Sequence, residues 1–263
     1  MTRKTVWNVA LGAAVTSVAL FTATAAMGET LVQNTVENRV LLAFRVDSAA
    51  LAEVMPEGWT PIVLPKGPVA GSNLILSFFD KLLITDAEGA PSDPASQPVM
   101  ALVAYGTAEG VEGVRSFVTA IYEVPPLVDP FGLSEAADIT RDAGMRYGAD
   151  GRTRTEAWVV QPASGGTFSF DLDYAVKGYA WSEDGTSMPY SAADPAFHEI
   201  YRFDQLAELV MNTTAGREID GNVSYSAEIP ALSGLFDGTE ELVAVVSIPV
   251  YLRQVFTPDA PDM

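Results

Sequence analysis

Few side chains in this sequence could carry out chemistry by themselves. The chain has one histidine, His198, and no cysteine. Without cysteine there are no disulfides, thiolate nucleophiles, zinc–sulfur sites or iron–sulfur clusters. A serine–histidine–aspartate triad would have to use His198, and no Gly-x-Ser-x-Gly turn accompanies it. We therefore expect a structural or surface role for His198, no metal site and no cofactor.

Lysine is also scarce, which limits amine catalysis. After the N-terminal region only Lys66, Lys81 and Lys177 occur. A lysine attacks a carbonyl only when its amine is neutral near pH 7, which requires desolvation or a neighbouring cation. The sequence places Lys66 in a Pro–Gly turn, Lys81 at a strand end and Lys177 on a predicted strand. None has a basic neighbour along the chain, so the sequence predicts no Schiff-base lysine.

Carboxylates are abundant, and Asp171 and Asp173 form the most suggestive pair. Residues two apart on a strand point the same way, so this pair could act as acid and base or hold Ca²⁺. They alternate, however, with Phe168, Phe170 and Leu172, which would share the opposite face. We therefore expect the two aspartates to lie on a solvated face.

The N-terminus has the three parts of a secretory signal. Arg3 and Lys4 come first, an apolar stretch spans 9–21, and small residues fill 23–28. The apolar stretch is shorter than the ~20 residues that span a bilayer, which favours cleavage over anchoring. We expect residues 1–28 to be a signal peptide and residues 29–263 to form a single exported domain, either periplasmic or secreted.

The expected mature chain is strongly acidic. Without Arg3 and Lys4 it has 13 basic and 34 acidic side chains, a net charge of −21. Such a surface repels nucleic acid and anionic lipid, which are bound through Lys and Arg. We expect a small molecule as partner, no nucleic acid, and no membrane contact after signal cleavage. A homo-oligomer is compatible with the sequence.

Strands dominate the predicted elements. Apolar, β-branched or alternating stretches predict strands at 38–46, 73–79, 99–105, 152–161, 167–175, 222–228 and 242–256. Helices are predicted at 47–55, with Asp47 or Ser48 as the N-cap, and at 134–143 and 203–212, with Ser134 and Asp204 as N-caps. This order favours an α+β, mostly antiparallel or barrel architecture over a doubly wound sheet.

Three stretches together resemble the acetoacetate decarboxylase-like superfamily. They are 40–58, a strand followed by a short helix and a Pro–Gly turn; 73–80, a strand ending in an aromatic–Asp step; and 235–256, the closing strands. The resemblance covers most of residues 36–256. It implies a cone-shaped, mostly antiparallel β-barrel with a few short helices around a largely apolar pocket.

The resemblance also implies a chemistry, from which this sequence departs. In the decarboxylases one lysine forms a Schiff base with a keto acid and a neighbouring lysine lowers its pKa. Residues 119–122 resemble the stretch that precedes these lysines, but Glu123 and Val124 stand near where the lysines would be. No lysine occurs between Lys81 and Lys177. The sequence thus predicts a divergent member that lacks the Schiff-base lysine.

Three functions remain open, and three residues are predicted for the site. In the first, the chain binds a small, mostly apolar molecule with a carbonyl or carboxylate, through Arg115, Tyr122 and Glu123, without Schiff-base decarboxylation. In the second it is a lyase in which Glu123 carries a proton, its pKa raised by burial. In the third it is a non-catalytic periplasmic binding or structural protein.

Overall fold

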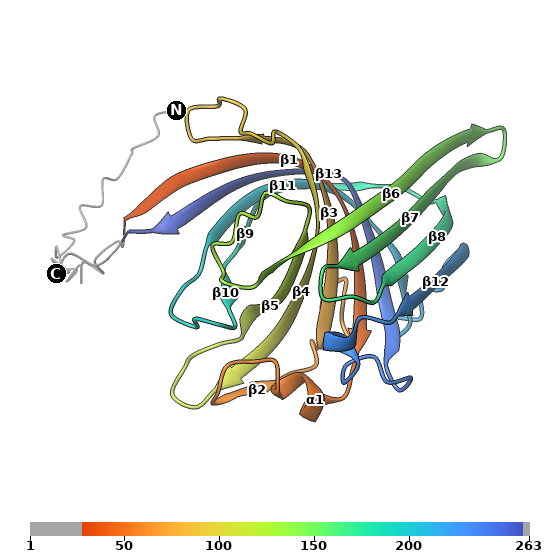
Figure 1. The fold of residues 1–263 in the computed structure, drawn as a ribbon. Helices are drawn as coiled ribbons and strands as arrows, with labels where there is room; N and C mark the ends of the chain where they lie inside the picture. The colour runs from red at the N-terminus through yellow and green to blue at the C-terminus, as the bar shows by residue number, and fades with distance from the viewer. Residues whose placement is uncertain (1–27, 260–263) are drawn as a thin grey trace, which may run out of the picture.

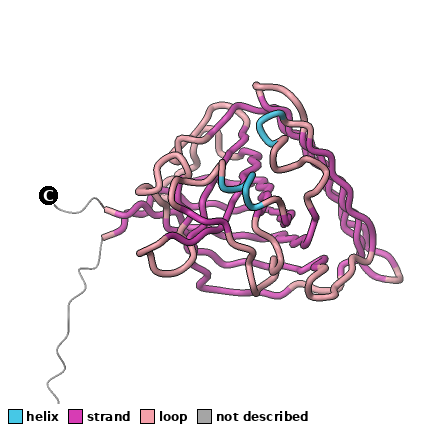
Figure 2. The backbone as a smooth tube through the Cα atoms, turned by 90° about the horizontal axis from the view of Figure 1, so that it is seen from below, coloured by secondary structure: helices cyan, strands magenta, loops and turns pink. Residues whose placement is uncertain are grey.

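The structure, a computed structural model, describes residues 28–259 (Figure 1). The predicted signal peptide lies outside the described residues, apart from Gly28. Strands make up most of the backbone, and the two short helices lie in the loops (Figure 2). The helices are α1 (Ser48–Ala52) and the 3₁₀ turn η1 (Pro230–Leu232). The strands are β1 (Glu29–Arg45), β2 (Trp59–Pro61), β3 (Leu74–Thr85), β4 (Gln97–Ala108), β5 (Arg115–Glu123), β6 (Ser134–Gly148), β7 (Gly151–Pro162), β8 (Phe168–Val176), β9 (Ala180–Ser187), β10 (Pro189–Ser191), β11 (Ile200–Asn212), β12 (Gly221–Ala227) and β13 (Glu241–Pro258).

The strands form one mixed sheet in the order β12-β8-β7-β6-β5-β4-β3-β1-β13-β11-β9. Most neighbours are antiparallel, but β5 pairs in parallel with both β6 and β10. The predicted mostly antiparallel, strand-rich class is confirmed, but the expectation of a closed barrel is wrong. Within the described residues the sheet is open, since its two edge strands, β12 and β9, do not pair with each other. The sheet folds over between β5 and β6. Strands β6, β7, β8 and β12 then form a second layer instead of pairing with β9 (Figure 1).

Two of the three predicted helices are strands. Residues 134–143 lie in β6, which pairs with β7 from Ala137 to Gly148, and residues 203–212 lie in β11 between β13 and β9. Asp204, predicted as an N-cap, instead accepts a hydrogen bond from the backbone N–H of Asp184 on β9 (3.0 Å). The first helix is confirmed as α1, where the Asp47 carboxylate caps two backbone N–H groups.

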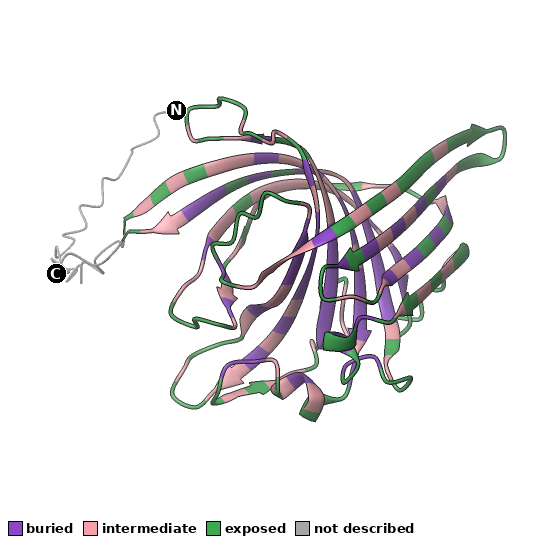
Figure 3. Ribbon diagram, viewed as in Figure 1, coloured by how far each residue is buried: buried purple, intermediate pink, exposed green. Residues whose placement is uncertain are grey.

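The main core lies between the two layers of the sheet. The Phe78 ring on β3 lies 5.5 Å from the ring of Trp158 on β7 and 4.7 Å from the ring of Phe170 on β8. The predicted alternation of β8 is confirmed: the aromatic and leucine side chains of 168–174 are buried, and Asp171 and Asp173 are exposed. Figure 3 shows burial concentrated where the layers overlap, while the far end of the β6–β7 hairpin is exposed.

The other face of the first layer is concave. Strands β1, β13 and β11 arch over it in Figure 1, and β3, β4 and β5 complete it. Because side chains alternate along each strand, every second residue of these strands points away from the main core into this concavity. Within residues 28–259 no helix has the length and apolar character needed to span a bilayer.

Candidate functional site

A cavity of about 550 Å³ occupies the concave side. Strand register brings its lining residues level with one another: Arg39 pairs with Phe79, Phe79 with Val99, and Val99 with Glu123. Its walls are largely apolar, but one zone is unusually rich in charged and hydroxyl groups. The polar side chains of this zone are Arg39, Lys81, Gln97, Glu123, Glu199, Tyr201, Tyr251 and Arg253.

Glu37 holds the cationic part of this zone together. Its fully buried carboxylate accepts hydrogen bonds from Arg39 Nε (2.5 Å) and Thr35 Oγ1 (2.5 Å), and it lies 2.7 Å from Arg253 Nη2. Burial alone would raise the pKa of Glu37, but the guanidinium groups of Arg253 and Arg39 outweigh it and lower that pKa to about 2. Glu37 is therefore ionised throughout the physiological range.

Arg39 is fixed by two aromatic rings as well as by Glu37. Its Cζ lies 3.6 Å from the ring centroid of Tyr251 and 4.2 Å from that of Phe79. Among the described residues its Nη2 has no hydrogen-bond partner although it is buried. Cation–π contacts of this kind hold a planar guanidinium in one orientation. Arg39 is thus held in one orientation beside the cavity.

Lys81 brings an amine into the same cavity. The sequence placed it at a strand end, but β3 continues to Thr85, so Lys81 is half-buried in mid-strand. Burial, together with the positive charge of Arg253, lowers the pKa of Lys81. In the part of the chain that the structure describes, no carboxylate oxygen lies within 4 Å of its Nζ. Desolvation and a neighbouring cation are the two conditions that keep a lysine amine neutral.

Two carboxyl groups of the cavity have pKa values that are shifted in the opposite direction from the pKa of Glu37. Burial raises the pKa of Glu123, whose carboxylate accepts a hydrogen bond from the Val128 backbone N–H (3.1 Å). Burial also raises the pKa of Glu199, which accepts a hydrogen bond from Tyr201 Oη (2.7 Å). Both groups therefore hold a proton more readily than an exposed glutamate, as a general acid requires.

The three residues predicted from the sequence fall in different places. Glu123 lines the cavity and is 1% exposed. Tyr122 points the other way, into the main core between the layers. Arg115, at the start of β5, stacks on the Tyr190 ring with its Cζ 4.3 Å from the centroid. The structure therefore does not bring the three together, and their contact with a ligand stays a prediction.

Sequence reasoning missed Arg39, Lys81 and Arg253 because they lie on three strands far apart in the chain. One signal was available for two of them: Lys81 is the single cation of β3 and Arg253 that of β13, and each shares its face of a largely apolar strand with buried residues. In β13, for example, Arg253 alternates with the buried Tyr251 and Val255. A charge at such a position is rarely buried unless it is paired or functional.

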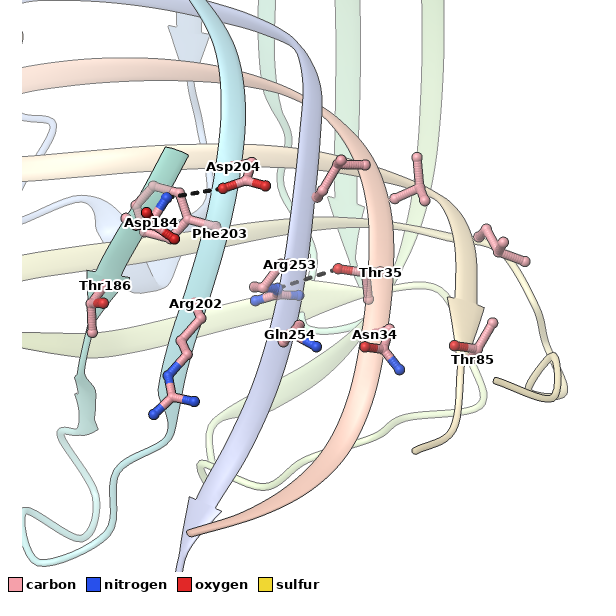
Figure 4. Close-up of a pocket in the computed structure, with 14 residues that line it drawn as sticks. Asn34, Thr35, Thr85, Asp184, Thr186, Arg202, Phe203, Asp204, Arg253 and Gln254 are labelled. Atoms are coloured by element: carbon pink, nitrogen blue, oxygen red, sulfur yellow. Dashed lines mark hydrogen bonds between the residues drawn. The ribbon is translucent and has the colours of Figure 1, made fainter. Parts of the chain in front are cut away.

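A second hollow, of about 530 Å³, lies over β9, β11, β13, β1 and β3 (Figure 4). Figure 4 draws two hydrogen bonds among the lining residues of this hollow, one from the Asp184 backbone N–H to the Asp204 carboxylate and one from Arg253 Nε to Thr35 Oγ1. Many of its lining side chains are exposed, including Asp184, Arg202 and Gln254. Solvent screens such groups, so they bind a ligand less strongly than the buried charges of the cavity. We therefore take the cavity as the candidate site.

Comparison with solved structures places this fold among known proteins. No model of a known protein family and no curated protein sequence matches the chain. An acetoacetate decarboxylase-like enzyme from Sphingomonas wittichii RW1 is similar over 93% of this chain and 98% of its own, with a TM-score of 0.53 and 15% identity.

Two further solved structures are similar to this chain over most of its length. The enduracididine biosynthesis enzyme MppR in complex with pyruvate covers 95% of this chain and 97% of its own (TM-score 0.51, 12% identity). An acetoacetate decarboxylase covers 86% and 87% (TM-score 0.50, 11% identity). The chain thus has the acetoacetate decarboxylase-like fold that the sequence resemblance implied, with a sheet that is not closed into a barrel in the described residues.

Proposed function

We propose that this chain is an exported protein that binds a small organic acid in the concave cavity. Export rests on the sequence of residues 1–28, and a mature N-terminus near residue 29 in the exported protein would support it. Binding rests on the charged zone of the cavity, where two arginines, Arg39 and Arg253, share one buried carboxylate, Glu37.

The charge balance of this zone is the observation that carries the proposal. Arg39 and Arg253 are permanently charged, whereas of the nearby carboxylates only Glu37 has a lowered pKa. The raised pKa values of Glu123 and Glu199 reduce their share of negative charge, and the lowered pKa of Lys81 reduces its share of positive charge, so that the two arginines set the balance. The zone is therefore more positive than the rest of this acidic protein. An apolar cavity with a cationic wall favours a carboxylate on an apolar body.

Calorimetric titration with an acid and its uncharged amide tests this proposal. Hydrogen bonds to a charged group contribute about 1.5–3 kcal/mol, so the acid should bind roughly 10- to 100-fold more tightly than the amide. Pyruvate and pyruvamide form one such pair. Arg39→Gln should remove most of the difference, whereas Arg45→Gln, at a half-exposed site outside the cavity, should keep it. Equal binding of acid and amide would contradict the proposal.

A second candidate function is amine catalysis, which the position of Lys81 favours. The sequence predicts no nucleophilic lysine in the central stretch, and this candidate takes the amine from β3 instead. Lys81 Nζ would attack the carbonyl carbon and form a C–N bond. The carbonyl oxygen would leave as water with one proton from the amine and one from Glu123, giving a protonated imine.

Reductive trapping separates the candidates. Borohydride with pyruvate should add a covalent label at Lys81, which Lys81→Gln should abolish and the exposed control Lys66→Gln should not. If turnover occurs without a label and Glu123→Gln abolishes it, the chain is a lyase in which Glu123 carries the proton. Binding without label or turnover would leave a non-catalytic binding protein.

A further inference from the structure

The cavity continues well beyond its charged zone. Along β4 and β5, one two-residue step from the pair Val99–Glu123 brings Ala101 opposite Ile121, and beyond a register shift in β5 Val103 lies opposite Val118. All four side chains line the cavity. Each is apolar, and Ala101 is small. The charged wall is therefore followed by a compartment, defined by Ala101, Val103, Val118 and Ile121, whose lining on these two strands is apolar.

The size of the cavity also indicates a ligand that extends beyond the charged zone. A water molecule takes up about 30 Å³ of the liquid, so about 550 Å³ corresponds to roughly 18 waters. A keto acid with about six non-hydrogen atoms would leave more than half of this space unfilled. Cavities of roughly 300–1,000 Å³ normally bury a molecule several times larger. An occupant that also fills the apolar compartment would displace the remaining water from apolar surface, which is favourable.

We infer that the ligand is a medium-chain carboxylic acid with an unbroken apolar tail. Its carboxylate lies against Arg39 and Arg253, and its tail lies along Ala101 and Val118. This inference rests on the proposed function, because it assigns the acid head to the charged zone. It adds that most of the binding free energy comes from the tail, so that short acids are weak ligands.

A chain-length series tests the inference. Straight-chain carboxylates of two to ten carbons are titrated into the protein by calorimetry. Burial of one methylene should raise the affinity about fourfold, until the compartment is full. Affinity independent of chain length would overturn the inference while leaving acid binding intact. Failure of every acid to bind would instead refute the proposed function.

Two variants locate the tail. Ala101→Leu should weaken binding of an eight-carbon acid at least tenfold and change that of a three-carbon acid less than twofold. Val118→Ala should shift the optimal chain length upward by about one methylene. Ala143→Leu, at an exposed position of β6, is the matched control and should change neither. If Ala101→Leu does not fold, Val118→Ala alone decides. An unchanged optimum in that variant, or an equal loss for long and short acids in Ala101→Leu, would overturn the inference.

Discussion

Replacement of Glu37 by glutamine tests the charge network most directly. The substitution keeps the side-chain shape but leaves Arg39 and Arg253 without their buried counter-charge. The pKa of Glu37 falls from 4.5 to about 2 on folding. At 1.36 kcal/mol per pH unit, the ionised carboxylate stabilises the folded state by about 3 kcal/mol at pH 7. Breaking a buried ion pair typically costs about 3–5 kcal/mol, which agrees.

The pH dependence gives this prediction its sign. Because the folded-state pKa lies below the unfolded one, the stabilisation is present above pH 4.5 and is lost as the pH falls towards 2. The difference in unfolding free energy between wild type and Glu37→Gln should therefore shrink from about 3 kcal/mol at pH 7 to about 1.5 kcal/mol at pH 3. Taking this difference removes the effects of the other carboxylates, which both proteins share.

Urea unfolding followed by tryptophan fluorescence at several pH values measures this difference. Glu241→Gln is the control, since Glu241 lies 3.8 Å from Arg45 in a pair exposed to solvent. Such surface pairs contribute about 0–1 kcal/mol, so the Glu241→Gln effect should change by no more than this between pH 7 and pH 3. A Glu37→Gln effect below 1 kcal/mol at pH 7, or one that does not change with pH, would refute the reasoning.

Three further predictions concern the scaffold and are measured by the same unfolding experiment. Phe78→Ala should destabilise the fold by about 3–5 kcal/mol, because its buried ring packs against Trp158 between the layers; Phe78→Leu should cost clearly less. Asp47→Ala should cost about 1 kcal/mol through loss of the α1 cap, and Asp47→Asn should restore most of it. Gly166→Ala should cost more than 1 kcal/mol, because its φ is +80° and a Cβ would lie 2.3 Å from the Glu228 carbonyl oxygen. Effects below 0.5 kcal/mol would contradict each of these expectations.

Local sequence patterns predicted the strands that have one face in the core and the other in water. Residues 168–174 alternate cleanly because one face of β8 covers the core and the other meets water, so period-two reasoning succeeds. The helix prediction for residues 203–212 failed because their intrinsic preference for helix opposes their position inside the sheet. This segment contains Leu, Ala, Glu, Gln and Met, all good helix formers, yet it lies between β13 and β9, and backbone pairing on both sides overrides that preference.

The site could be predicted only in small part. Glu123 was found because its strand also carries the family resemblance. The network around Glu37 was not, because Arg39 and Arg253 are brought together only by pairing between β1 and β13. Lys81 was misread for a local reason: the apolar run that marks β3 weakens after Phe79, although the strand continues to Thr85. Long-range register of this kind has no signal within a short window of sequence.

The pairing of β1 with β13 also affects how the chain folds during synthesis. About 200 residues separate Arg45 from Glu241, its partner in β13. At a synthesis rate of about 5–20 residues per second, β1 emerges roughly 10–40 s before that partner exists. Because Arg253 lies on β13, the charged wall cannot form earlier, and β11, which β13 connects to β1, cannot join the sheet. The Glu37 carboxylate therefore lacks one of its two arginine partners until nearly all of the chain has been made, which leaves time for binding by chaperones.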